Sequence, residues 1–187
     1  MSDMYGKYYS PTLAGVTYHG STAVGGVLVP ISTTTSPTFG LWNPAGSGKN
    51  AILIKYKAGW VSTTGDPGTI CYSRLLSTGS SIATGAPISV FNSGTPTNGV
   101  IGSGVSSSMR FCPAGTTTLT TAGAVYATSG YSQLTTTGAT TSAPMWQVED
   151  DFDGTTIIPP GVFWYTTGTA ALLSLFVQTL SWIEVET

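Results

Sequence analysis

The sequence predicts an all-β protein folded as an antiparallel two-sheet jelly-roll sandwich. Short apolar runs separated by Gly, Pro, Ser and Thr recur along the chain, and β-branched residues are abundant in them. Few stretches exceed ten residues without a turn residue, which leaves little room for helical periodicity. A length of 187 residues suits one domain. We therefore expect an N-terminal arm over residues 1–15 and a single sandwich domain over residues 16–187.

The composition narrows the class of protein further. Only 7% of the residues are charged, against about 25% in an average soluble domain. The surface must therefore consist largely of Thr, Ser, Gly and Asn, which is typical of secreted, fibrous and virion proteins. With a net charge of −2, the chain offers no basic field for nucleic acid or an anionic membrane. We also expect no signal peptide and no segment that spans a bilayer.

The clearest strand is NAILIKYKAGW (residues 50–60), where a period of two divides a core face from a solvent face. The core face would carry Ile52, Ile54, Tyr56 and Ala58, and the other face Lys55 and Lys57 together with Leu53. After the turn STTGDPGT, we expect TICYSRLL to return as its partner strand. Shorter strands are predicted at APISVFN, SSMRFCP and AGAVYAT.

The last third of the sequence predicts three more strands, APMWQVED, VFWYTTG and AALLSLFVQTLSWIEVE. The last of these is apolar on both faces near its start, so it needs cover from a second sheet or from a neighbouring subunit. We expect a homotrimer with this strand near the threefold axis. The residues predicted at the subunit interface are Leu172, Phe176, Leu180 and Trp182.

The stretch NPAGSGKN (residues 43–50) resembles a phosphate-binding P-loop, but it fails the requirements of that motif. Asn43 stands where the first glycine belongs, Asn50 replaces the magnesium-binding hydroxyl, and a strand follows instead of a helix. We interpret the stretch as a hairpin loop between FGLW and NAILIKY. No nucleotide or other cofactor is expected.

The acidic stretch EDDFDG matches the first half of a calcium-binding loop through Glu149, Asp151 and Asp153. The closing glutamate of such a loop would fall at Pro160, which has no side-chain oxygen. A solvated acidic turn is therefore the favoured interpretation, and a non-standard calcium site is the alternative.

Nothing in the sequence assembles a catalytic site. The single histidine is His19, and no serine lies in a strand–turn–helix elbow where it could act as a nucleophile with this histidine. No carboxylate pair is placed across a cleft either. We expect no enzyme activity and no small-molecule substrate. Cys71 and Cys112 are interpreted as small buried hydrophobic residues, with a disulfide between them as the alternative.

Aromatic residues are the remaining feature. The five tryptophans suit a sandwich core and subunit interfaces, although exposed rings could also stack on sugars. The arm carries Met4, Tyr5, Tyr8 and Tyr9 with little charge, so it would be costly to leave in water. We expect the arm to dock onto a partner, and an edge strand of the same domain is the alternative.

Two segments resemble small structural proteins of tailed bacteriophage virions, which have a jelly-roll fold like that of tumour necrosis factor. These are FGLWNPAGSGKNAILIKYKAGW, which is similar to their early hairpin, and IIPPGVFWYTTGTAALLSLFVQTLSWIEVE, which is similar to their last one. The resemblance implies a trimeric capsid decoration (cement) protein on the exterior of the virion, made in the host cytoplasm and bound to the major capsid protein. The alternative is a head-fibre, tail-fibre or receptor-binding module that recognises host-surface glycan.

Overall fold

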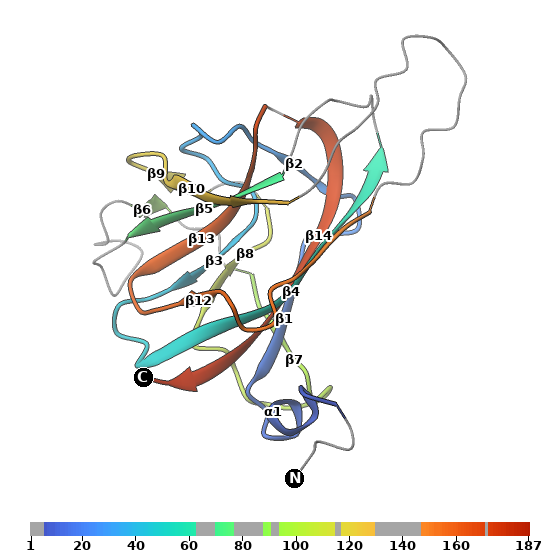
Figure 1. Cartoon of the computed structure of the whole chain (residues 1–187), viewed down its shortest axis with the longest axis vertical. Coiled ribbons are helices and arrows are strands. Elements are labelled where there is room, and N and C mark those ends of the chain that lie inside the picture. The colour runs from blue at the N-terminus through green and yellow to red at the C-terminus, as the bar shows by residue number, and fades with distance from the viewer. Residues whose placement is uncertain are drawn as a thin grey trace.

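The computed structural model describes residues 6–62, 70–76, 88–90, 94–114, 117–129, 147–170 and 172–187. In these residues two antiparallel sheets face each other as two layers, and one short helix lies near the N-terminus (Figure 1). The predicted all-β class and the antiparallel two-sheet sandwich are therefore confirmed.

Sheet A has the strand order β11-β4-β14-β1-β7, with β12 paired to β4 and β2 paired to β14. Its strands are β1 (Thr17–Ser21), β2 (Val27–Val29), β4 (Lys49–Ser62), β7 (Thr97–Asn98), β11 (Gln147–Asp151), β12 (Ile157–Ile158) and β14 (Leu172–Glu186). Sheet B has the order β10-β5-β13-β3-β8. Its strands are β3 (Gly40–Asn43), β5 (Ile70–Leu76), β8 (Arg110–Cys112), β10 (Ala124–Thr128) and β13 (Val162–Gly168). β6 (Ile88–Val90) and β9 (Thr118–Leu119) form a separate pair, and the helix is α1 (Tyr9–Leu13).

Several strands that follow one another in sequence lie in opposite sheets. β13 and β14 lie in different sheets, so the last segment is not the hairpin that it resembles in sequence. β3 and β4 do not pair either, so the predicted hairpin at NPAGSGKN is instead a connection between the sheets. The side-chain amide of Asn43 holds it by donating to the carbonyls of Lys49 at 2.7 Å and Ile158 at 2.8 Å, and Gly48 supplies a φ of +66°. The expected pairing of TICYSRLL with β4 is also wrong, because β5 pairs with β13 and β10. Turn residues mark where the chain bends, but they do not say which strand it meets next.

A β-bulge interrupts the predicted alternation of β4. Lys55 lies opposite Ser181 and Leu53 opposite Trp182, so Ile54 is the extra residue. Beyond the bulge the inward row passes to Leu53, which is fully buried, while Ile52 on the predicted core face is only half-buried. The lysines do lie on the outer face, as the pattern predicted.

Aromatic side chains fill the space between the sheets. Trp164 stacks on Tyr72 with ring centroids 5.4 Å apart, and Trp182 stacks on Tyr18 at 6.1 Å. Trp42, Trp164 and Trp182 are all buried, Trp164 and Trp182 in this core and Trp42 in a second cluster with Phe163 and Tyr165, which confirms the core interpretation for these three tryptophans. Trp146 lies outside the described residues.

The inward face of β14 belongs to this core. Phe176, Leu180 and Trp182 are at most 1% exposed in the single chain. Their assignment to a subunit interface is therefore corrected, because sheet B already covers them and no neighbour can reach them. The side chain of Leu172 lies outside the described part of the structure. The opposite, outward face carries half-buried residues, among them Val177 and Ile183.

Cys71 and Cys112 are buried and are not joined by a disulfide, so the disulfide alternative is not the one that the structure adopts. Burial raises the pKa of both the Cys71 and the Cys112 thiols. They behave as small hydrophobic residues of sheet B.

Candidate functional site

The N-terminal arm and the acidic turn, two features that the sequence analysis singled out separately, meet at one cleft. The cleft has a volume of about 420 Å³ and opens on the outer face of sheet A, beside α1. We call it the arm cleft. Its charged and polar lining residues are Lys7, Tyr8, Thr12, Thr17, His19, Lys55, Asp151, Asp153 and Ser181.

The arm folds against its own chain as a short helix, not as the edge strand that was the alternative. Lys7 forms an ion pair with Asp153, and the Tyr8 hydroxyl donates a hydrogen bond to the same carboxylate. At the other end of α1, the side-chain amide of Asn98 donates to the carbonyl of Gly15 at 2.7 Å. No residue of α1 is buried. The arm is thus held at its two ends by polar contacts.

Two apolar side chains of α1 face outward. Tyr9 is 44% exposed and Leu13 is 68% exposed. They are four residues apart, so they lie on the same side of the helix and form one small patch. Met4 and Tyr5, the other two predicted arm residues, lie outside the described residues.

The bulge in β4 positions the acidic turn. The carbonyl of Ile54 accepts hydrogen bonds from the backbone N–H groups of Phe152 at 2.9 Å and Asp153 at 3.1 Å. Asp153 has a φ of 53°, in the left-handed region, and Gly154 follows it with a φ of 84°. This turn aims the Asp153 carboxylate at the arm. The sequence signal for it was the Asp-Gly pair, whereas the bulge itself had no signal.

Lysines neutralise the acidic residues. Lys55 lies 2.5 Å from Glu149 and 3.0 Å from Asp151, and Lys57 lies 3.4 Å from Glu149. The hydrogen bond from Lys55 lowers the pKa of Glu149. The hydrogen bonds from Lys7 and then Tyr8 lower the pKa of Asp153. Lysines of the chain itself therefore favour the ionised forms of Glu149 and Asp153.

The three carboxylates of the proposed calcium site do not converge on one point. Glu149 and Asp151 pair with lysines of β4, whereas Asp153 pairs with the arm. Within the described ranges, no three His, Cys, Asp or Glu side chains are grouped so that they could hold one metal ion. The acidic turn is instead a docking point for positive and hydroxyl groups.

His19 lies in the arm cleft as the neighbour of Ser181 across strands β1 and β14. The His19 Nδ1 and the Ser181 hydroxyl oxygen are 2.8 Å apart, and desolvation lowers the pKa of the imidazole. Ser181 sits between β4 and β1 in the middle of the sheet, where pairing uses the backbone N–H groups that an oxyanion hole would need. The pair thus forms part of the polar lining of the arm cleft.

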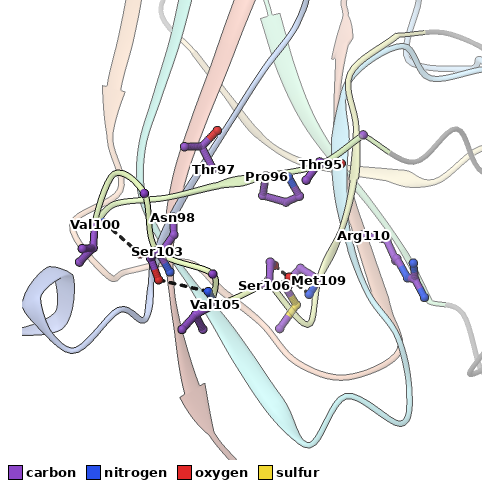
Figure 2. Close-up of a pocket in the computed structure, with 14 residues that line it drawn as sticks. Thr95, Pro96, Thr97, Asn98, Val100, Ser103, Val105, Ser106, Met109 and Arg110 are labelled. Carbon is purple, nitrogen blue, oxygen red and sulfur yellow. Dashed lines mark hydrogen bonds between the residues drawn. The ribbon is translucent and has the colours of Figure 1, made fainter.

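A second pocket lies between β7 and β8, where the chain runs out and back as a loop (Figure 2). Its volume is about 410 Å³, and Ser, Thr, Gly and Asn make up most of its lining. Two turns shape it: Val100 N–H donates to the Asn98 side chain at 2.9 Å, and Val105 N–H donates to the Ser103 hydroxyl at 3.1 Å.

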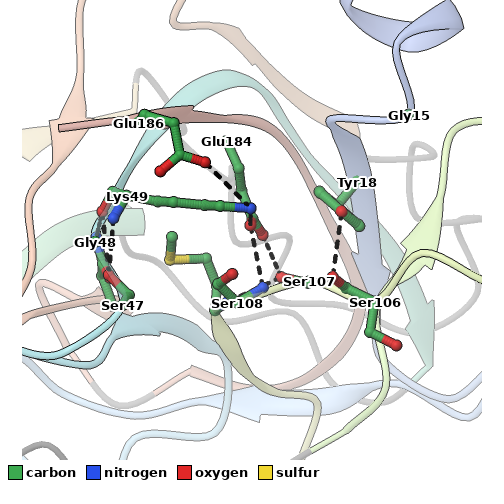
Figure 3. A network of polar contacts seen from close by, with 12 residues as sticks. Gly15, Tyr18, Ser47, Gly48, Lys49, Ser106, Ser107, Ser108, Glu184 and Glu186 are labelled. Carbon is green, nitrogen blue, oxygen red and sulfur yellow. Dashed lines mark hydrogen bonds and ion pairs between the residues drawn. The ribbon is translucent and has the colours of Figure 1, made fainter.

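Glu184 ties this loop to sheet A (Figure 3). Its carboxylate accepts hydrogen bonds from the Ser107 hydroxyl, from the Ser108 N–H at 3.0 Å and from the Trp182 indole at 3.3 Å. Lys49 lies 3.8 Å away. Glu184 is only 2% exposed. The sequence analysis missed this role, although Glu184 falls on the same face of its strand as Phe176 and Trp182.

No protein-family model matches the chain, and neither does any curated protein or solved structure. In the part of the chain that the structure describes, no helix has the length and apolar character needed to cross a membrane. Function is therefore inferred from the residues and geometry above.

Proposed function

We propose that this protein is a non-enzymatic structural protein of a tailed-bacteriophage virion, a decoration protein that binds the exterior of the capsid. The segments at residues 39–60 and 157–186 support this through their resemblance to such proteins. The low charge and hydroxyl-rich composition support it independently. Decoration would work by mass action: a protein that binds only the assembled shell of major capsid protein stabilises that shell.

We further propose the jelly-roll topology and a homotrimer. Consecutive main strands that alternate between the sheets, β3 to β4 to β5 and later β13 to β14, support the jelly roll. The trimer interface would use outward side chains, because the inward face of β14 is already covered. Light scattering should give about three times 19.2 kDa, and a mass of one chain at micromolar concentration would rule the trimer out.

The arm is the observation that carries the decoration proposal. α1 buries none of its residues, yet it displays Tyr9 and Leu13 side by side on its outer surface. A helix of five residues has little stability of its own, and exposing two apolar side chains on it brings no benefit to the isolated chain. If the patch packs against another protein, that contact stabilises the helix and removes both apolar side chains from water.

Binding to capsids that lack this protein tests the proposal directly. The variant Y9A/L13A should fold normally, since both side chains are exposed, and it should lose most of its binding in a co-sedimentation assay. Val24→Ala is the matched control, because Val24 is 90% exposed and lies outside the arm; its binding should be unchanged.

The outcomes separate the two parts of the proposal. If the unmodified protein does not co-sediment with undecorated capsids, it is not a decoration protein. If the unmodified protein binds and Y9A/L13A binds equally well, decoration stands but the arm is not the anchor.

A further inference from the structure

A third cavity lies away from the arm cleft, where β12 of sheet A approaches β13, β5 and β10 of sheet B. It has a volume of about 580 Å³, which is within the range of ligand-binding pockets. We call it the side groove. The residues that matter here are Arg74, Tyr126, Ile157, Ile158, Val162 and Trp164.

The floor and walls of the side groove are largely apolar. Ile158 and Trp164 are 1% exposed and form the floor, whereas Ile157 is 54% exposed and Tyr126 is 41% exposed at the mouth. Large exposed apolar side chains around a buried apolar floor are typical of a surface that binds another apolar group.

One wall of the groove is built with an irregular strand. In β10, Val125 pairs with Ser73 and Ala127 with Tyr72, so Tyr126 is an extra, bulged residue. Its hydroxyl accepts a hydrogen bond of 2.8 Å from the indole nitrogen of Trp164. Gly123 fixes the approach of this strand, since a Cβ there would lie 2.5 Å from the carbonyl oxygen of Arg74. The shape of the groove is therefore already formed in the free protein.

Arg74 supplies a positive charge at the rim. Lys7, Lys49, Lys55 and Lys57 all form ion pairs, but Arg74 forms none with any described residue. A guanidinium group binds a carboxylate through two parallel hydrogen bonds. In a chain with only six Lys and Arg residues, a cation beside an apolar groove favours a ligand that is apolar and anionic at once.

We propose that the side groove binds an extended peptide segment of a partner protein, with an apolar side chain entering between Tyr126 and Ile157 and a neighbouring carboxylate pairing with Arg74. Within the described residues, β12 pairs only with β4 and β10 only with β5. A bound segment can therefore lie along these two edges and use main-chain groups as well as its side chains. This inference goes beyond the proposed function and does not depend on the arm.

Short synthetic peptides test it. The probes are four blocked peptides, Ac-Ser-X-Asp-Ser-NH₂ with Leu, Ile, Phe or Tyr at X, each compared with its counterpart that has Asn in place of Asp. Binding is followed by nuclear magnetic resonance through the indole N–H signal of Trp164, which is assigned with the variant W164F. At least one Asp peptide should shift this signal saturably, and its Asn counterpart should bind at least about tenfold more weakly.

Variants and a small probe complete the experiment. Arg74→Gln should abolish the preference for Asp over Asn, while Arg110→Gln, which removes an exposed arginine of the loop pocket, should leave that preference unchanged. The proposal is overturned if no Asp peptide shifts the signal saturably, or if Arg74→Gln retains the preference. It is also overturned as a peptide site if 3-phenylpropionate, a free carboxylate with an apolar body, binds as tightly as the best peptide.

Discussion

Replacing Glu184 by alanine should destabilise the protein far more than replacing Glu186, which lies two residues further along the same strand. Both carboxylates lie within 4 Å of the Lys49 ammonium group, at 3.8 and 3.9 Å. They differ in burial, since the Glu184 side chain is 0% exposed and the Glu186 side chain is 82% exposed. Comparing the two alanine variants therefore separates the effect of burial from the effect of charge.

The magnitude follows from the donors that Glu184 satisfies (Figure 3). Without the carboxylate, the Ser108 N–H and the buried Trp182 indole lose their acceptor, while the Ser107 hydroxyl can rotate to another one. An unsatisfied buried donor costs about 1–3 kcal/mol, and the Ser108 N–H is only part-buried, so the two together should cost about 3 kcal/mol. In a chain of this size that lowers the thermal midpoint by roughly 6–12 °C. For Glu186, an exposed ion pair, the change should stay below about 0.5 kcal/mol.

Scanning calorimetry and urea unfolding at neutral pH measure both variants. Glu184→Gln should fall between the unmodified protein and Glu184→Ala, because its amide oxygen still accepts but its NH₂ group faces donors. The reasoning is refuted if Glu184→Ala and Glu186→Ala unfold within about 1 °C of each other.

Three further predictions concern packing, pH and thiol reactivity. Gly40→Ala should lower the free energy of unfolding by about 1–3 kcal/mol, because a Cβ there would lie 2.5 Å from a carbonyl oxygen of β13. Gly59→Ala, with no atom within 4 Å of its Cβ, is the control, and equal urea midpoints would contradict the prediction. The arm contact of Asp153 should be present above about pH 4 and should be lost as the pH falls through the lowered pKa of its carboxyl. Carboxyl and tyrosine resonances that fail to move together in acid would count against it. Cys71 and Cys112 should not react with a thiol reagent at neutral pH until urea unfolds the chain, because burial raises the pKa of both thiols; labelling of the folded protein would show that the sheet opens.

The strand periodicity predicted local properties well. The outward position of Lys55 and Lys57 follows from alternation along one strand, and so does the common face of Phe176, Leu180 and Trp182. The alternation of apolar and polar residues shows which face of a strand is apolar, but it does not show what packs against that face. The apolar row of β14 was assigned to a neighbouring subunit, but sheet B of the same chain covers it.

Polar residues on the inward rows were harder to predict. Gln178 and Glu184 interrupt an apolar segment in sequence, yet both are buried. Gln178 is accommodated because its carbonyl oxygen accepts hydrogen bonds from the Tyr56 and Thr166 hydroxyls, each at 2.8 Å. Those partners come from other strands, so no local pattern could have indicated that the side-chain oxygen of Gln178 would be satisfied there.

The sequence by itself determined the all-β class, the low surface charge, the outward lysines and the aromatic core, because each depends on composition or on residues a few positions apart. The tertiary structure decided which strands pair, where β4 bulges and which acidic groups meet which cations. Tyr8 and Asp153 are 145 residues apart, and their contact exists only because the bulge at Ile54 aims the acidic turn at the arm. Such contacts depend on how distant segments are brought together, and that is a property of the folded sheets.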